Sequence, residues 1–216
     1  MDKELIKRIL SSIIIIPLSL FFIFKGSTFF ILFLVIVFLI SFLEWLNMTK
    51  KLEIKILGLL FLLFSFYSTF SLREDGLTSF LLIIIICVST DLGGYIFGKL
   101  FKGPKLIKIS PNKTYSGMLG GFLLSIISSY FFIAQYNPSF ILNNDDIGNL
   151  KFIIFIFIIS GISQIGDLII SYFKRKAKLK DTGKIIPGHG GLLDRIDGLI
   201  FVFPALFILA LIIKLN

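Results

Sequence analysis

The chain has 216 residues, of which 56% are hydrophobic and 16% are charged, and its mean hydropathy is +0.96. Average globular chains are nearer ~45–50% apolar and ~25% charged, so this composition excludes a water-soluble domain, a disordered chain and a coiled coil, and predicts an integral membrane protein. We attribute the net charge of +9 to basic segments beside a bilayer and expect no nucleic-acid partner.

Seven apolar segments are candidate membrane-spanning helices. Each such helix needs ~17–25 mostly apolar residues, because it rises ~1.5 Å per residue across a hydrocarbon layer ~30 Å thick. The segments cover residues 9–25, 28–46, 56–72, 77–97, 117–136, 151–172 and 196–213. The first could alternatively be a signal peptide, since Lys3, Lys7 and Arg8 precede it, but no Ala-x-Ala-like cleavage site follows. The predicted fold class is an all-α, polytopic integral membrane protein.

Lysine and arginine fall mainly on one side of these spans. If the N-terminus is cytoplasmic, 18 of the 22 Lys and Arg residues lie in inner segments, including the long loops 98–116 and 173–195. The positive-inside rule therefore predicts a cytoplasmic N-terminus in a multi-pass protein of the cytoplasmic membrane. Cys87, the single cysteine, lies within the fourth apolar segment and has no intrachain disulfide partner.

Polar chemistry is uneven along the chain. We expect residues 1–76 to form transmembrane helices without evident chemistry, and residues 77–216 to form a catalytic membrane region whose active site faces the cytoplasm. No repeat of 20–50 residues is visible, and the spans do not form two similar halves. This weakens the interpretation as an inverted-repeat transporter.

Two carboxylates lie near the inner ends of predicted spans, Asp91 in the fourth and Asp167 in the sixth. A carboxylate at the centre of a spanning helix costs ~2.5–3.5 kcal/mol, which favours a functional role, although an interfacial Asp can simply meet water or a lysine. Ser163, Asp167, Ser171 and Lys174 are spaced to lie on one stripe of the helix. An acid beside several bases suits a metal-bound phosphate.

The two inner loops could bind an anion. In the segment 180–197, glycines 188, 190 and 191 allow positive φ and close backbone approach to a phosphate. We interpret His189 as a substrate contact, because one His and one distant Cys make a poor zinc site. In the loop 98–116, Ser110 and Lys113 could contact phosphate, although an ordinary basic loop attracted to anionic lipid is the simpler alternative. This loop has no Walker A pattern.

A longer pattern begins at Ser171. It reads Ser171-Tyr-Phe-Lys174-Arg175, Lys180-Asp181, Pro187-Gly-His189-Gly-Gly191 and Asp194-Arg-Ile-Asp197. These residues resemble the signature of the CDP-diacylglycerol synthases, also called phosphatidate cytidylyltransferases, at every fixed position. Asp91–Gly98 and Ile109–Thr114 resemble two weaker segments of that family. The family usually has Trp-Glu-Gly where this chain has Tyr115-Ser116-Gly117, so no acidic role is carried over to position 116.

The resemblance implies that a cytidylyl group passes from CTP to phosphatidate, giving CDP-diacylglycerol and pyrophosphate. It implies that Asp167, Lys174 and Asp194 are catalytic, that Asp167 and Asp194 hold Mg²⁺, and that Lys174 neutralises phosphate charge. It also allows a K⁺ ion nearby and implies a homodimer. The candidate substrate-binding residues are Asp91, Ser110, Lys113, Ser171, Arg175, Lys180, Asp181, His189, Gly190, Gly191, Arg195 and Asp197.

Two other functions remain as alternatives. A CTP-dependent lipid kinase, such as a polyprenol kinase, would transfer the γ-phosphoryl group instead of the cytidylyl group. An anion or lipid transporter would use the same intramembrane acids without consuming nucleotide, but it leaves the long pattern after Ser171 unexplained.

Overall fold

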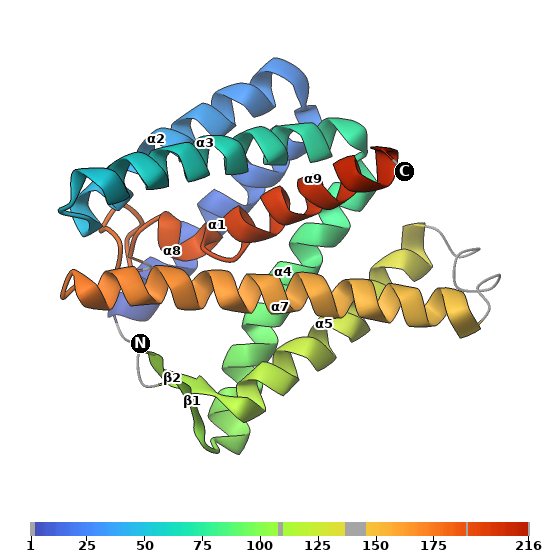
Figure 1. Cartoon of the computed structure of the whole chain (residues 1–216). Coiled ribbons are helices and arrows are strands. Elements are labelled where there is room, and N and C mark those ends of the chain that lie inside the picture. Colours follow the sequence, from blue (N-terminus) through green and yellow to red (C-terminus); the bar gives the residue numbers. More distant parts are fainter. Residues whose placement is uncertain (1–2, 108–109, 137–145, 189, 216) are drawn as a thin grey trace. The chain divides into compact units, whose positions relative to one another are not determined.

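The computed structural model describes residues 3–107, 110–136, 146–188 and 190–215 (Figure 1). Among these residues the chain is almost entirely helical. The helices are α1 (Lys3–Lys25), α2 (Ser27–Met48), α3 (Leu52–Asp75), α4 (Leu77–Phe101), α5 (Tyr115–Tyr136), α7 (Asp146–Lys176), α8 (Leu193–Ile196) and α9 (Leu199–Leu215). Two short strands, β1 (Lys105–Ile107) and β2 (Ser110–Thr114), lie between α4 and α5.

The seven predicted spans all coincide with helices. Five of them, α2, α3, α4, α5 and α7, are long and apolar enough to cross a membrane. The apolar parts of α1 and α9, Leu10–Lys25 and Leu199–Lys214, are shorter. Large apolar side chains remain exposed along these helices, as expected where lipid replaces water around the protein. The predicted all-α polytopic membrane fold is therefore confirmed.

The chain divides into two compact units. Unit 1 comprises residues 1–77 and 172–216, and unit 2 comprises residues 78–171. The first three helices thus belong with the last two, although more than ninety residues separate them in the sequence. The division falls inside α7, after Ser171.

In unit 1, α3 packs against both α2 and α9, and α2 also contacts α1 and α8 (Figure 1). Gly58 allows the close approach of α3 to α2, because a Cβ there would overlap the indole ring of Trp45. The indole N–H donates to the carbonyl of Ile54 at 3.2 Å. Between α3 and α9, the ring centroids of Phe61 and Phe201 lie 4.7 Å apart.

In unit 2, small residues bring α4 and α5 together. A Cβ on Gly93 of α4 would lie 2.9 Å from the Cα of Gly121 in α5. Hydroxyl groups add further contacts: Ser128 donates to Ser89 at 2.7 Å, and Thr90 in α4 donates to Ser160 in α7 at 2.8 Å. Small residues and hydroxyl pairs are the usual means of packing helices in lipid, where the hydrophobic effect does not drive their association.

Part of the loop 98–116 forms an antiparallel hairpin that the sequence did not predict. Lys105 pairs with Thr114 and Ile107 with Ser110. The Thr114 hydroxyl accepts the backbone N–H of Gly117 at 3.1 Å and so caps the first turn of α5. The Ser116 hydroxyl donates to the carbonyl of Lys102. The hairpin is therefore tied to the start of α5.

Candidate functional site

In unit 1, the Asp194 carboxylate is held by donors from two segments. Its Oδ1 accepts a bond from the Lys174 ammonium at 2.6 Å. Its Oδ2 accepts the backbone N–H groups of Thr182 at 2.8 Å and Gly191 at 3.1 Å, and lies 3.0 Å from the Thr182 hydroxyl oxygen. The Lys174 and Asp194 side chains are only 11% and 6% exposed. The structure therefore brings together two of the three residues predicted to be catalytic.

Glycines shape the segment that precedes Asp194. Gly188 and Gly190 have positive φ, at 77° and 85°, as predicted, whereas Gly191 does not. Ile186 and Gly190 form an antiparallel bridge that closes this turn. A Cβ on Gly190 would lie 3.2 Å from Asp194 Oδ2, and one on Gly191 would lie 2.6 Å from Glu44 Oε2. Backbone conformation therefore favours glycine at position 190, and lack of space favours it at position 191.

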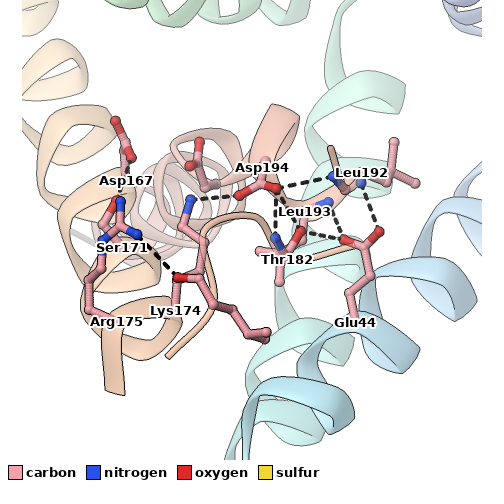
Figure 2. A network of polar contacts seen from close by, with 12 residues as sticks. Glu44, Asp167, Ser171, Lys174, Arg175, Thr182, Leu192, Leu193 and Asp194 are labelled. Carbon is pink, nitrogen blue, oxygen red and sulfur yellow. Dashed lines mark hydrogen bonds and ion pairs between the residues drawn. The ribbon is translucent and has the colours of Figure 1, made fainter. Parts of the chain in front are cut away.

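Glu44, near the C-terminal end of α2, lies beneath the same segment. Glu44 is buried, with only 2% of the residue exposed. Its Oε1 accepts the N–H of Leu192 at 2.9 Å, and its Oε2 accepts the N–H of Leu193 at 2.8 Å and the Thr182 hydroxyl at 2.7 Å. Figure 2 shows the Thr182 side chain between the carboxylates of Glu44 and Asp194.

The remaining candidates in unit 1 differ in exposure. Arg175, Lys180, Asp181 and Arg195 are exposed, which suits groups that meet a ligand arriving from water. The Arg175 guanidinium donates to the carbonyl of Leu179 at 3.2 Å. Asp197 is buried, and its carboxylate accepts the N–H of Gly198 at 3.0 Å. His189, predicted to be a substrate contact, lies outside the described residues.

In unit 2, Asp167 is the centre of a smaller polar cluster. Its Oδ1 accepts the hydroxyl of Ser171, one turn further along α7, at 3.3 Å. Its Oδ2 forms an ion pair with Lys113 of β2. The side chains of Lys113 and Asp167 are 26% and 27% exposed, so the pair is accessible to a ligand. Three of the five unit 2 candidates therefore lie together.

The other two candidates of unit 2 are Asp91 and Ser110. Asp91 is exposed on α4, and Ser110 begins β2. The predicted stripe on α7 is confirmed in part, because Asp167 and Ser171 are hydrogen-bonded to each other. Ser163, one turn before Asp167 on the same helix, is fully buried.

The two carboxylates predicted to be catalytic, Asp167 and Asp194, offer the oxygen donors that a hard divalent cation prefers. Each has one oxygen that faces a lysine ammonium, a position that another cation could share or take. Among residues 3–107, 110–136, 146–188 and 190–215, no group of three or more His, Cys, Asp or Glu side chains could hold a metal. A cation at either carboxylate would therefore take most of its ligands from water and phosphate oxygens, as Mg²⁺ commonly does.

A family model described as the cytidylyltransferase family matches residues 54–213. This chain belongs to that family. The chain is also 37% identical over 220 residues to a phosphatidate cytidylyltransferase of Rickettsia felis. This alignment covers 98% of the present chain and 95% of the relative. A phosphatidate cytidylyltransferase of Rickettsia conorii is 36% identical and covers 94% and 89%. One from Staphylococcus haemolyticus is 42% identical over 148 residues, 67% of this chain and 52% of the relative.

The matched region of this cytidylyltransferase-family chain contains all the predicted site residues, but it begins after Glu44. Glu44 and Thr182 were not among the residues predicted to be functional. A signal for Glu44 was present, because it is an acid inside the predicted span 28–46. The rule that drew attention to Asp91 and Asp167, that an ionisable group in a span is functional by default, applies equally to Glu44.

Proposed function

We propose that this chain transfers a cytidylyl group from CTP to phosphatidate, forming CDP-diacylglycerol and pyrophosphate for phospholipid biosynthesis. Its membership of the cytidylyltransferase family and the names of its relatives support this reaction. The structural observation that carries the proposal is the buried pair between Lys174, at the end of α7, and Asp194, in the glycine-rich segment 180–197. That segment provides both signs of charge and a close backbone, which a triphosphate with a divalent cation requires.

The reaction requires charge and position more than proton transfer. A phosphatidate oxygen attacks the α-phosphorus of CTP in line, and pyrophosphate leaves. A phosphate is largely ionised at pH 7, so little general-base catalysis is needed. The two reactants are both anions, however, and the protein must offset their repulsion. The exposed bases Arg175, Lys180 and Arg195 suit this task.

We assign roles to Lys174 at the end of α7 and to residues of the segment 180–197. Lys174 neutralises phosphate charge, and the donors around Asp194 fix the carboxylate that faces it. Gly190, with positive φ, presents its backbone to the nucleotide. We assign Asp181, His189, Gly191 and Asp197 to substrate binding in the same segment.

The residues of unit 2 complete the proposed set. Asp167 carries the second functional carboxylate, with Ser171 as its hydroxyl partner. Lys113 of β2 neutralises Asp167 in the absence of ligand, and together with Ser110 it contacts substrate phosphate. Asp91 contributes to substrate binding from α4.

We propose Mg²⁺ as the cofactor, with Asp167 and Asp194 each as a candidate protein ligand and a K⁺ ion as a further candidate. When bound, Mg²⁺ stabilises negative charge on phosphate oxygens. The protein residues supply the rest, by holding the two carboxylates and the lysines in fixed hydrogen-bonded positions.

The protein is a multi-pass membrane protein, and we place it in the cytoplasmic membrane with the active site facing the cytoplasm. The distribution of Lys and Arg supports this orientation. Phosphatidate keeps its acyl chains in the bilayer whereas CTP arrives from water, so the reaction belongs at the membrane surface. We propose a homodimer as the working assembly.

One assay tests the function against its alternatives. Purified protein in detergent is incubated with phosphatidate, Mg²⁺ and CTP labelled in the cytosine ring. The proposal predicts cytidine label in the lipid phase and an equal amount of pyrophosphate. A lipid kinase would leave the label in water as CDP, and a transporter would consume no CTP. Either result would contradict the proposed reaction and support the corresponding alternative.

A further inference from the structure

Glu44 forms hydrogen bonds to the signature segment, residues 171–197, although it lies outside that segment. It belongs to α2, 138 residues before Thr182 and 149 before Leu193, yet it accepts bonds from both at 2.7 and 2.8 Å. With the N–H of Leu192, three donors converge on a buried carboxylate. Burying a carboxylate is costly unless its oxygens are hydrogen-bonded. The three hydrogen bonds therefore stabilise the buried Glu44 carboxylate and also fix the positions of Thr182, Leu192 and Leu193.

The segment that Glu44 holds is the one that fixes Asp194. Leu193 directly precedes Asp194, and Thr182 gives its backbone N–H to Asp194 Oδ2. The Thr182 hydroxyl lies 2.7 Å from Glu44 Oε2 and 3.0 Å from Asp194 Oδ2. A hydroxyl has one proton, so it can donate to one carboxylate at a time. Any shift of Glu44 therefore changes the hydrogen bonding of Asp194.

The end of α2 also contacts the neighbourhood of Lys174. The Trp45 ring, next to Glu44, packs edge-on against Phe173 with 4.8 Å between ring centroids. A second tie comes from α1, where the Ser11 hydroxyl donates to the carbonyl of Pro187 at 3.1 Å. The N-terminal helices therefore support both partners of the Lys174–Asp194 pair.

We propose that Glu44 is a positioning residue for cytidylyl transfer: through Thr182, Leu192 and Leu193 it fixes the place of Asp194 relative to Lys174. The inference rests on the proposed function and adds to it a residue of the N-terminal helices. Groups that orient a functional ligand through hydrogen bonds typically change affinity or activity by ~10–100-fold when they are replaced.

Glu44→Gln is the sharpest test, because glutamine keeps the shape but has a single acceptor oxygen. Its NH₂ group must face either the Leu192 N–H or the two donors at Oε2, so at most two of the three bonds survive. Two controls match it. Ser41→Ala changes a buried side chain one turn earlier whose hydroxyl bonds to Val37 of its own helix. Glu53→Gln removes the same charge at an exposed position of α3.

Two measurements separate positioning from simple structural support. Hydrogen exchange of the amides of Leu192 and Leu193, without substrate or metal, should accelerate in Glu44→Gln and not in the controls. Turnover per folded molecule should fall by about 10–100-fold, with a higher half-saturating Mg²⁺ concentration, while both controls stay within about twofold of the wild type. A residue with only a structural role would lower the folded yield and leave both kinetic values unchanged.

Variants of Thr182 provide a second test that does not depend on the folding of Glu44→Gln. Thr182→Val removes the hydroxyl that joins the two carboxylates, and Thr182→Ser restores it. Serine should recover most of the turnover that valine loses. Wild-type turnover and Mg²⁺ dependence in folded Glu44→Gln, or equal activity of the valine and serine variants, would overturn the inference. A wild-type protein that makes no CDP-lipid would instead refute the proposed function, and the kinetic role of Glu44 with it.

Discussion

Replacing Lys174 by methionine tests the ion pair on which the proposed function depends. Methionine keeps most of the length of the side chain and removes its charge. At 2.6 Å and an effective dielectric constant of 20, the attraction between Lys174 and Asp194 is about 6 kcal/mol before the cost of desolvation. Breaking a buried pair by removing one partner typically costs ~3–5 kcal/mol. Asp194 keeps its donors at Oδ2, so we expect about 3 kcal/mol.

The assay can use the only tryptophan of the chain. Trp45 packs against Phe173, the neighbour of Lys174, so its fluorescence reports unfolding of this region. Denaturant titration in detergent should show Lys174→Met and Asp194→Asn each strongly destabilised. The double variant should be less destabilised than the sum, because it leaves no unpaired buried charge. All three should also lose turnover, and a loss of about 3 kcal/mol of transition-state stabilisation would lower the rate by a factor on the order of 10².

Lys176→Met is the matched control for this experiment. Lys176 lies two residues further along α7, is exposed, and has its ammonium 5.6 Å from the ring of Tyr172. Its loss should cost about 0.5–1 kcal/mol at most. Strictly additive destabilisation in the Lys174 and Asp194 double variant, or an equal loss in Lys176→Met, would show that the pair contributes nothing specific.

Three further outcomes are expected. Asp167→Asn should lower CDP-lipid synthesis by about 10² and raise the Mg²⁺ requirement, because charge is lost and shape is kept; unchanged Mg²⁺ dependence in a folded variant would contradict its role as a ligand. Gly191→Ala should lower turnover, because its methyl group would meet two side-chain oxygens, whereas Gly161→Ala has no atom within 4 Å and should match the wild type in the same assay. In a chain without its native cysteine, Lys184→Cys should resist an impermeant thiol reagent in intact cells and Asp75→Cys should react; the reverse pattern would invert the proposed topology.

The helices were predictable from the sequence because a membrane-spanning helix requires a long uninterrupted run of apolar residues. It predicted their ends less well. The sixth span was expected to end at residue 172, but α7 continues to Lys176. Basic residues at a helix C-terminus interact favourably with its dipole, so a drop in hydropathy there does not end the helix. The hairpin β1–β2 was missed because three- and five-residue strands leave no periodic pattern.

The site was predictable where its residues are close in sequence. Lys174, Gly190 and Asp194 all lie in the signature segment, and two of them form the buried ion pair. Glu44 could have been singled out as an acid within a span, but its partners could not. Its bonds to Thr182 and Leu193 join positions more than 130 residues apart. Such pairings depend on how the helices of unit 1 pack, which hydropathy alone does not determine.

The long separation between Glu44 and its donors has a consequence for biosynthesis. A ribosome adds about 5–20 residues per second, so the 138 residues between Glu44 and Thr182 represent roughly 7–30 s of synthesis. Throughout that interval the carboxylate at the end of α2 has none of the three donors that it accepts in the finished protein. A nascent chain halted before Thr182 would carry this acid without any of those three donors. Such a chain exposes a feature that quality-control proteases or chaperones could use to tell unfinished molecules from finished ones.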